Sequence, residues 1–360
     1  MKPRDSPKGV HYWTPFLLEH CMKIPYNKAM KRLGLFIIFL IGGGILFSWI
    51  ITHVGWEEIL RIALEFSPEK WLLILFLSVL MMVLGVVRWR GILQSKHEHI
   101  SFWAAFRLYL AGYSLIFFAP MVVLGGETFR AYALKESTTI SFSKSFSSVI
   151  IERILELTAH FFVVVLGLLI VALQSSAEES RFFLWIVFLV GIFGIAIFVF
   201  YVRSLWGRGF LSLFIRNTGG NLKEAEKEII DFFRWRNPGF RQGLLLSILR
   251  NSIALLRTWL LVFFLTGSWN VLHALSILGF YYLALLVPTP ASLGSHDVLQ
   301  VFAFQAFGFS ASLGAAFVLI IRTAEFLIAL VGIFFLFIAG IKIVRTIVSR
   351  RVENLFSNKH

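Results

Sequence analysis

The sequence predicts an all-α polytopic membrane protein with about six full transmembrane helices plus two re-entrant helical hairpins in an inverted repeat. The first observation behind this prediction is composition, because 58% of the 360 residues are hydrophobic and phenylalanine occurs 39 times. A soluble domain of this length cannot bury so much apolar surface. The second observation is that several apolar runs reach the roughly 20 residues that cross a bilayer as a helix. These runs are continuous and do not alternate in polarity, which favours helices over a β-barrel.

Six continuous apolar runs are the expected spans. They are residues 33–52, 71–87, 146–173, 182–202, 243–266 and 313–341. Two further stretches, 102–124 and 271–309, are apolar but interrupted, so the charges around them decide whether they cross. A full crossing by 102–124 would place the basic loop 203–241 outside, against the bias of basic loops toward the cytoplasm. We therefore expect the first stretch to enter from the cytoplasm and the second from outside, each returning to its own face.

The spans define a single transmembrane domain, residues 33–345, which follows a basic cytoplasmic segment, 1–32. Residues 346–360 form a short tail that the basic residues also place in the cytoplasm. Segment 1–32 has no apolar core, so we do not expect it to be a cleavable signal peptide. We expect an integral protein of a bacterial-type cytoplasmic (inner) membrane with both termini inside.

One cytoplasmic segment, 203–241, contains an amphipathic pattern over 221–239. Asn221 followed by Glu224 resembles a helix cap, and Pro238 is expected to stop the helix. Its apolar face suits either the membrane interface or packing against the helical bundle.

The net charge of +14 would suggest nucleic acid as the partner of a soluble protein. Here the basic residues lie between apolar runs, where they set topology and attract anionic lipid headgroups, so no nucleic-acid partner is expected. The single cysteine, Cys21, excludes an internal disulfide and a cysteine metal cluster. The sequence has no phosphate-binding loop, dinucleotide fingerprint or zinc-protease motif, so we expect neither a cofactor nor a metal.

The two interrupted stretches resemble each other. Pro120 precedes Glu127 by seven residues, and Pro290 precedes Asp297 by the same distance. The residues expected to shape the two hairpin tips are Pro120, Gly125 and Gly126 in one stretch and Pro288, Pro290 and Gly294 in the other. Residues 102–173 and 271–341 are therefore predicted to be repeat units of opposite orientation, as in many transporters whose substrate site lies between the repeats.

Each repeat unit continues into a span with an Arg-x-x-Glu pair, Arg153 with Glu156 and Arg322 with Glu325. A charge inside the membrane costs about 2.5–3.5 kcal/mol even on insertion scales, so such residues are expected to pair or to face water. In one interpretation, Arg153 and Arg322 bind an anionic headgroup, for which a guanidinium fork is well shaped. In the other, each Arg–Glu pair fastens the hairpin next to it.

Glu127 and Asp297 start the returning half of each hairpin, where a carboxylate can cap the helix. Alternatively, they pair with Arg130, Arg153 or Arg322, or carry protons for coupled transport. His296, beside Asp297, is a candidate for titration near neutral pH or for a hydrogen-bonded turn.

Three stretches together, PMVVLGGETFRAYALKE, SFSSVIIERILEL and PTPASLGSHD, resemble the lysylphosphatidylglycerol synthase transmembrane-region family of flippase-like integral membrane proteins. The resemblance covers about residues 33–345. The first motif matches through Pro120, Gly126, Glu127, Arg130, Glu152 and Arg153. The second motif departs from the family pattern, since Ala291 and Ser292 stand where two glycines are usual and Asp297 stands for a glutamate.

In the best-known members of that family, the membrane region is fused to a soluble aminoacyl transferase and is implied to move the aminoacylated lipid between leaflets. We expect no aminoacyl transfer here, because residues 346–360 leave no room for that domain. The resemblance implies a lipid flippase or scramblase-like transporter for an anionic phospholipid or lipid-linked intermediate, and a transporter is favoured over an enzyme. The alternatives are an integral-membrane transferase with a lipid-linked donor, or a non-catalytic membrane partner of a glycosyltransferase or lipid-modifying enzyme.

Overall fold

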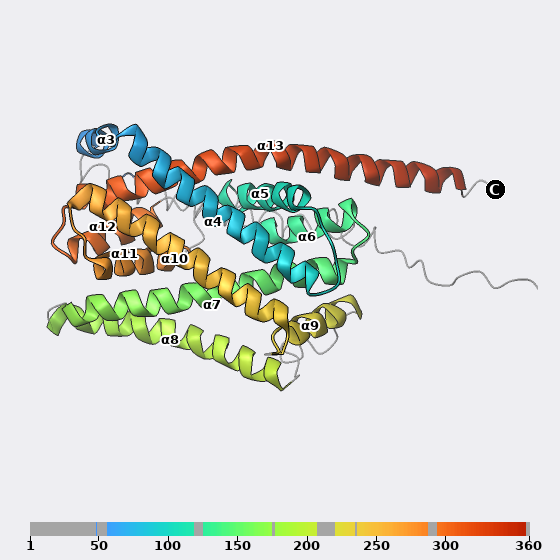
Figure 1. The fold of residues 1–360 in the computed structure, drawn as a ribbon, viewed down its shortest axis with the longest axis horizontal. Helices are drawn as coiled ribbons and strands as arrows, with labels where there is room; N and C mark the ends of the chain where they lie inside the picture. Colours follow the sequence, from blue (N-terminus) through green and yellow to red (C-terminus); the bar gives the residue numbers. More distant parts are fainter. Residues whose placement is uncertain are drawn as a thin grey trace, which may run out of the picture.

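The computed structural model describes Ser48 and residues 56–118, 125–174, 177–206, 220–234, 236–286 and 294–357. These ranges contain eleven helices and no strand, which confirms the all-α prediction for the described part of the chain (Figure 1). The helices are α3 (Trp56–Leu64), α4 (Pro68–Gln94), α5 (Phe102–Phe118), α6 (Gly125–Ser137), α7 (Phe142–Gln174), α8 (Ala177–Leu205), α9 (Gly220–Phe232), α10 (Pro238–Thr266), α11 (Val271–Ala284), α12 (Ser295–Gln305) and α13 (Ala311–Ser357).

Several predicted features lie outside the described residues. They are the basic segment 1–32, the expected span 33–52 apart from Ser48, and the hairpin-tip prolines Pro120, Pro288 and Pro290.

Four of the described helices are long and apolar enough to cross a membrane. They are α4, α7, α10 and the part of α13 from Ala311 to Ile341. Helix α8 has 29 residues, and its described apolar stretch runs only from Val190 to Ser204. Helices α5 and α11, with 17 and 14 residues, are shorter than the roughly 20 that span a bilayer. The count of six spans plus two hairpins therefore remains a prediction.

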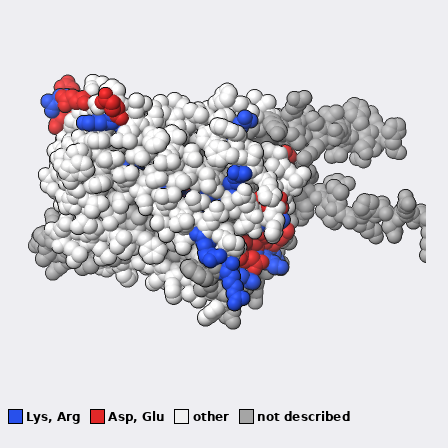
Figure 2. All heavy atoms as spheres, viewed as in Figure 1, with Lys and Arg blue, Asp and Glu red and all other residues white. Residues whose placement is uncertain are grey.

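The lateral surface of the bundle is apolar. Large hydrophobic side chains are exposed on it, including Leu173 on α7 (85% exposed), Trp185 on α8 (69%) and Phe337 on α13 (68%). Figure 2 shows charged residues gathered at opposite ends of one face, with a nearly uncharged band between them. An exposed apolar surface of this extent is typical of a protein in contact with lipid.

The helices form two interlocked units, α4 to α7 and α10 to α13. Helix α4 packs along α10, α5 along α13, and α11 along α7, so each hairpin lies against the long helix of the other unit. The pair α5–α6 occupies one end of the bundle and the pair α11–α12 the other (Figure 1). Each packed unit therefore includes one helix before the predicted repeat units 102–173 and 271–341, and the repeat itself stays a prediction.

Helix α9 corrects the predicted amphipathic helix 221–239, because α9 ends at Phe232. Pro238 does not stop this helix. It is the first residue of α10, where a proline costs no hydrogen bond, and the side chain of Asn237 caps α10 by accepting from the Gly239 amide at 2.9 Å. The apolar face of α9 packs against α7 of the bundle, where Phe232 is buried.

Helix α13 is the longest described helix, with 47 residues and a length of about 70 Å. It contains the predicted span 313–341 and continues through Ser357, so most of the expected tail 346–360 is helical. No proline or glycine interrupts the chain between 341 and 357. Figure 1 shows this helix reaching well beyond the rest of the bundle.

Candidate functional site

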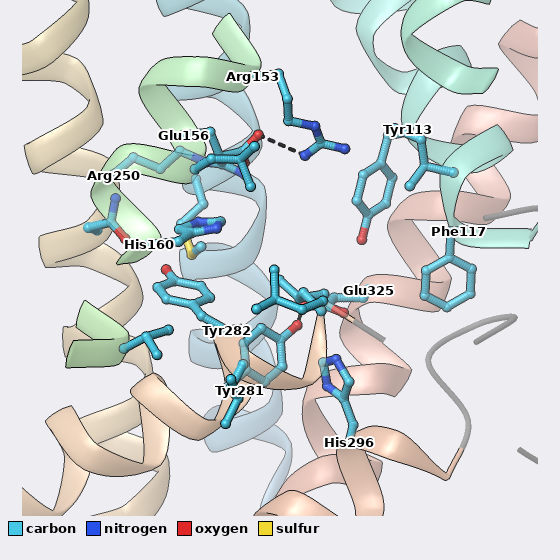
Figure 3. A pocket seen from close by; sticks show the side chains of 18 of the residues that line it. Tyr113, Phe117, Arg153, Glu156, His160, Arg250, Tyr281, Tyr282, His296 and Glu325 are labelled. Atoms are coloured by element: carbon cyan, nitrogen blue, oxygen red, sulfur yellow. Dashed lines mark hydrogen bonds and ion pairs between the residues drawn. The ribbon is translucent and has the colours of Figure 1, made fainter. Parts of the chain in front are cut away.

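A cavity of about 700 Å³ lies between the two units. Side chains from every helix between α4 and α13 except α9 line it, and many of them are charged (Figure 3). The charged lining residues are Arg130, Arg153, Arg250, Arg257 and Arg322, together with Glu127, Glu152, Glu156 and Glu325. Aromatic and aliphatic side chains, among them Phe117, Phe161 and Leu286, complete the wall. The cavity therefore combines a strongly charged interior with an apolar rim.

Glu152 on α7 is the centre of one buried cluster, with only 3% of its side chain exposed. One carboxylate oxygen accepts from Arg88 on α4 at 3.0 Å and from the Tyr109 hydroxyl on α5 at 2.9 Å. The other oxygen accepts from Arg130 on α6. The Arg130 guanidinium also lies over the rings of Trp89 and Tyr109, at 4.6 and 4.7 Å. These contacts fix α6 against α4, α5 and α7 through charge pairing and cation–π attraction.

Glu156 stands one turn further along α7 and binds three arginines. Arg153 donates to it at 3.1 Å, Arg250 on α10 donates to its other oxygen, and Arg88 lies 3.9 Å away. Arg153 also donates to Glu127, in the first turn of α6. The predicted pair Arg153–Glu156 therefore exists, and the helix-starting carboxylate Glu127 is ion-paired with the same arginine.

The second unit repeats this arrangement at its own hairpin. Arg322 on α13 donates to both oxygens of Asp297, at 3.5 and 3.2 Å. Asp297 also caps α12, because it accepts from the Gly294 amide at 2.9 Å. Gly294 has a φ of 79°, a left-handed conformation that favours glycine. The two roles considered for Asp297, helix cap and partner of an arginine, are therefore combined in one carboxylate.

Glu325 belongs to the Arg-x-x-Glu pair with Arg322 in the sequence, and in the structure it is bound by residues from other helices. The Tyr281 hydroxyl on α11 donates to it at 2.5 Å, and Arg257 on α10 lies 3.5 Å away. Arg257 also donates to the Ser78 hydroxyl on α4 at 3.0 Å. This carboxylate therefore ties α13 to α10 and α11.

Two histidines face the aromatic side of the cavity (Figure 3). The His160 ring on α7 stacks on Tyr282 with 3.8 Å between ring centroids. The His296 ring meets Tyr281 edge-on at 4.6 Å. His296 is only 4% exposed, and its Nε2 has no hydrogen-bond partner among the described residues. A buried polar atom of this kind is costly unless a ligand or water satisfies it.

A close approach of backbones sets the position of α6. An added Cβ on Gly126 would lie 2.4 Å from the carbonyl oxygen of Gly112 on α5, so no side chain fits there. Gly125, the other glycine of the predicted tip, is the first residue of α6. Because Gly126 allows α6 to pack this closely against α5, Glu127 and Arg130 of α6 lie at the cavity wall.

Of the eight predicted headgroup residues, seven line the cavity, and the eighth, Asp297, is bound to the cavity residue Arg322. Sequence reasoning missed Arg88, Arg250 and Arg257, all of which lie within or at the end of long apolar helices. An arginine inside an apolar span is itself a functional signal, and the predicted span 243–266 contains it at Arg250 and Arg257, whereas Arg88 lies just after the predicted span 71–87. No group of three or more metal-binding side chains occurs among the residues that the structure describes.

The sequence matches the profile of the family described as the lysylphosphatidylglycerol synthase TM region over residues 33–332. It is also 26% identical over 325 residues to a UPF0104 membrane protein of Methanocaldococcus jannaschii, an alignment that covers 85% of this chain and 93% of the relative. The chain therefore belongs to the lysylphosphatidylglycerol synthase TM region family and is an integral membrane protein.

Proposed function

We propose that this member of the lysylphosphatidylglycerol synthase TM region family moves the anionic headgroup of a membrane lipid between leaflets through the cavity. The observation that carries the proposal is that five arginines line a cavity of about 700 Å³ inside an otherwise apolar bundle. Charges at such a depth are costly, and they typically mark the path of a substrate.

The chemistry of the lining supports a phosphate-containing headgroup. Guanidinium groups present several donors in a plane that matches phosphate oxygens. Arg153, with 34% of its side chain exposed, is the most accessible of the five cavity arginines. A headgroup that enters near Arg153 would compete with Glu127 and Glu156 for its guanidinium. Because these carboxylates already hold the Arg153 side chain in place, that side chain loses little conformational entropy when a headgroup binds.

The apolar rim provides a route for the lipid tails. Leu285 and Leu286, just after α11, line the cavity and are 44% and 52% exposed. Phe117 lines it from α5. With the headgroup among the arginines, the acyl chains can remain in contact with the surrounding lipid and never enter the charged interior.

In the membrane, we place six helices across the bilayer and the two hairpins as re-entrant elements from opposite faces. The bias of basic residues and the position of the two hairpins at opposite ends of the bundle support this arrangement. We place both termini in the cytoplasm and the protein in the cytoplasmic membrane. The two related pairs, Glu127–Arg153 and Asp297–Arg322, then bind the headgroup in turn as it moves.

The proposal is tested with purified protein in liposomes that contain a headgroup-labelled anionic lipid. We expect Arg153→Ala and Arg322→Ala each to abolish headgroup movement, while the proteins still fold. The matched control is Arg234→Ala, because Arg234 lies just after α9 and its side chain is 60% exposed. Wild-type rates of movement in both cavity variants would rule the proposal out.

A further inference from the structure

We infer that Arg250 makes the cavity selective for a headgroup with one net negative charge, as in a phosphodiester lipid. The inference rests on the proposed function, since it names the substrate class of the same cavity. It comes from comparing the charges of the two repeat units position by position.

Most cavity charges occur in matched pairs about 169 residues apart. Arg88 corresponds to Arg257. Arg88 donates at 3.0 Å to Ser247, which lies ten residues before Arg257, and Arg257 donates at 3.0 Å to Ser78, which lies ten residues before Arg88. The further matched charges are Glu127 with Asp297, Arg153 with Arg322, and Glu156 with Glu325. Each arginine in this set is balanced by a carboxylate, so the matched set has no net charge.

Two further charges in the first unit also cancel. Arg130 and Glu152 form an ion pair, and the corresponding positions in the second unit are the neutral residues Gln300 and Ile321. Both units are thus neutral at these positions, one through an ion pair and the other through uncharged side chains.

Arg250 is the charge that is cancelled neither by a matched pair of repeat positions nor by a carboxylate of its own. Its counterpart in the first unit is Met81, which also lines the cavity. Counting the six arginines and five carboxylates of the two clusters leaves one net positive charge. Arg250 donates to Glu156, a carboxylate that Arg153 and Arg88 also hold. The charge of Arg250 is therefore in excess of what the described cluster needs.

Buried polar atoms without hydrogen-bond partners indicate which kind of ligand the extra positive charge of Arg250 would bind. Among the described cavity residues, the Nε atoms of Arg130, Arg250 and Arg257 and the Nε2 atom of His296 are buried and have no hydrogen-bond partner. The unpartnered buried acceptor on the same wall is Oδ1 of Asn251. A ligand that supplies several acceptor oxygens and one negative charge would satisfy the three arginine donors, together with His296 in its Nε2-protonated tautomer, and neutralise the cluster.

A phosphodiester has one negative charge and meets both requirements. A phosphomonoester carries about −1.5 to −2 near neutral pH, and a pyrophosphate carries at least as much, so either would leave the filled cavity net negative. A zwitterionic headgroup would leave the charge of Arg250 uncompensated in a low-dielectric site. The charge balance of the cavity thus favours a lipid headgroup with a single phosphodiester, whether the group attached to that phosphate is glycerol-like or a sugar.

The test is lipid competition on the purified full-length protein, read by native mass spectrometry. Phosphatidylglycerol, phosphatidylethanolamine and phosphatidic acid with identical acyl chains provide one, zero and close to two net negative charges. We expect phosphatidylglycerol to be retained about tenfold over each of the others, as expected for one partly screened charge in a site of intermediate dielectric. Equal retention of phosphatidylethanolamine, or preferred retention of phosphatidic acid, would overturn the inference.

Arg250→Met provides the second measurement, because it installs the residue that the other unit has at this position. Glu156 keeps Arg153 and Arg88 in this variant, so the fold is expected to survive. The preference for phosphatidylglycerol over phosphatidylethanolamine should fall to about twofold or less, and Arg250→Lys should restore it. The control, Arg241→Met, removes an exposed charge from the same helix and should leave the preference intact.

The binding test also separates this inference from the proposed function. Headgroup movement in liposomes without preference among the three lipids would refute charge selection by Arg250 and leave translocation standing. Selective retention of phosphatidylglycerol without any headgroup movement would support charge selection and refute translocation.

Discussion

Arg257 on α10 donates a hydrogen bond of 3.0 Å to the hydroxyl of Ser78 on α4. The reverse contact, from Arg88 on α4 to Ser247 on α10, has the same length. The two serines precede the arginines of their own helices by ten residues in both cases. This reciprocal pair of bonds joins the two units at the place where α4 and α10 pack together, beside the cavity.

Ser78→Ala and Ser247→Ala should lower stability by similar amounts, because each removes one acceptor from a buried arginine. The expected loss is about 1–3 kcal/mol for each variant. Thermal unfolding in detergent measures it, with Ser252→Ala as the control, since this exposed hydroxyl on α10 bonds only to its own helix at Ile248. A loss in the control as large as in the two variants would contradict the assigned role of the contacts.

Glu152→Ile should be among the most destabilising changes, with a cost of about 3–5 kcal/mol, because it leaves Arg88 and Arg130 without their shared carboxylate. The double variant Arg130→Gln with Glu152→Ile copies the neutral pair of the second unit, Gln300 and Ile321. We expect the double variant to recover part of the loss, measured as a coupling energy in a double-mutant cycle. Strict additivity of the two single changes would contradict the correspondence between the units.

Gly126→Ala should destabilise the protein by about 1–3 kcal/mol, because the added methyl group would overlap the Gly112 carbonyl and Ile116. Gly191→Ala on α8 is the matched change in open space, where no heavy atom lies within 4 Å of an added Cβ. Alanine is the better helix former, so this control should be neutral or stabilising by about 0.5–1 kcal/mol. Unfolding temperatures that fall equally in both variants would show that α6 does not depend on the close approach.

Much of the fold followed from hydrophobic length alone. The spans predicted at 71–87, 146–173, 243–266 and 313–341 lie within α4, α7, α10 and α13, because a helix in lipid must satisfy its backbone internally over a fixed thickness. The boundaries were less predictable. Helix α4 extends to Gln94 and α13 to Ser357, since the end of an apolar run does not end a helix that lacks a breaking residue.

The repeated motif also identified one part of the site. The separation of 26 residues from Glu127 to Arg153 and of 25 from Asp297 to Arg322 is the separation of two ion-paired partners in the structure. The local Arg-x-x-Glu rule was a poorer guide to Glu325, which binds Tyr281 and Arg257 from other helices. Such contacts depend on how helices far apart in sequence pack together, and spacing along one helix cannot reveal them.

Arg250 was missed for a related reason. It lies inside a span that hydrophobicity alone identifies, and its carboxylate partner, Glu156, belongs to another helix. Its mismatch with Met81 follows from the correspondence between α4 and α10 as the first helices of the two units, which depends on how the helices pack.

The most direct test of the central claim is to block the cavity reversibly while headgroup movement is recorded. In a Cys21→Ser background, which removes the single native cysteine, Tyr113→Cys places a thiol on the cavity wall. The control Trp103→Cys places one on the same helix at a side chain that is 65% exposed. A bulky disulfide-forming reagent should stop headgroup movement in the Tyr113→Cys protein only, and a reductant should restore it. Undiminished movement through a fully modified cavity would contradict the account.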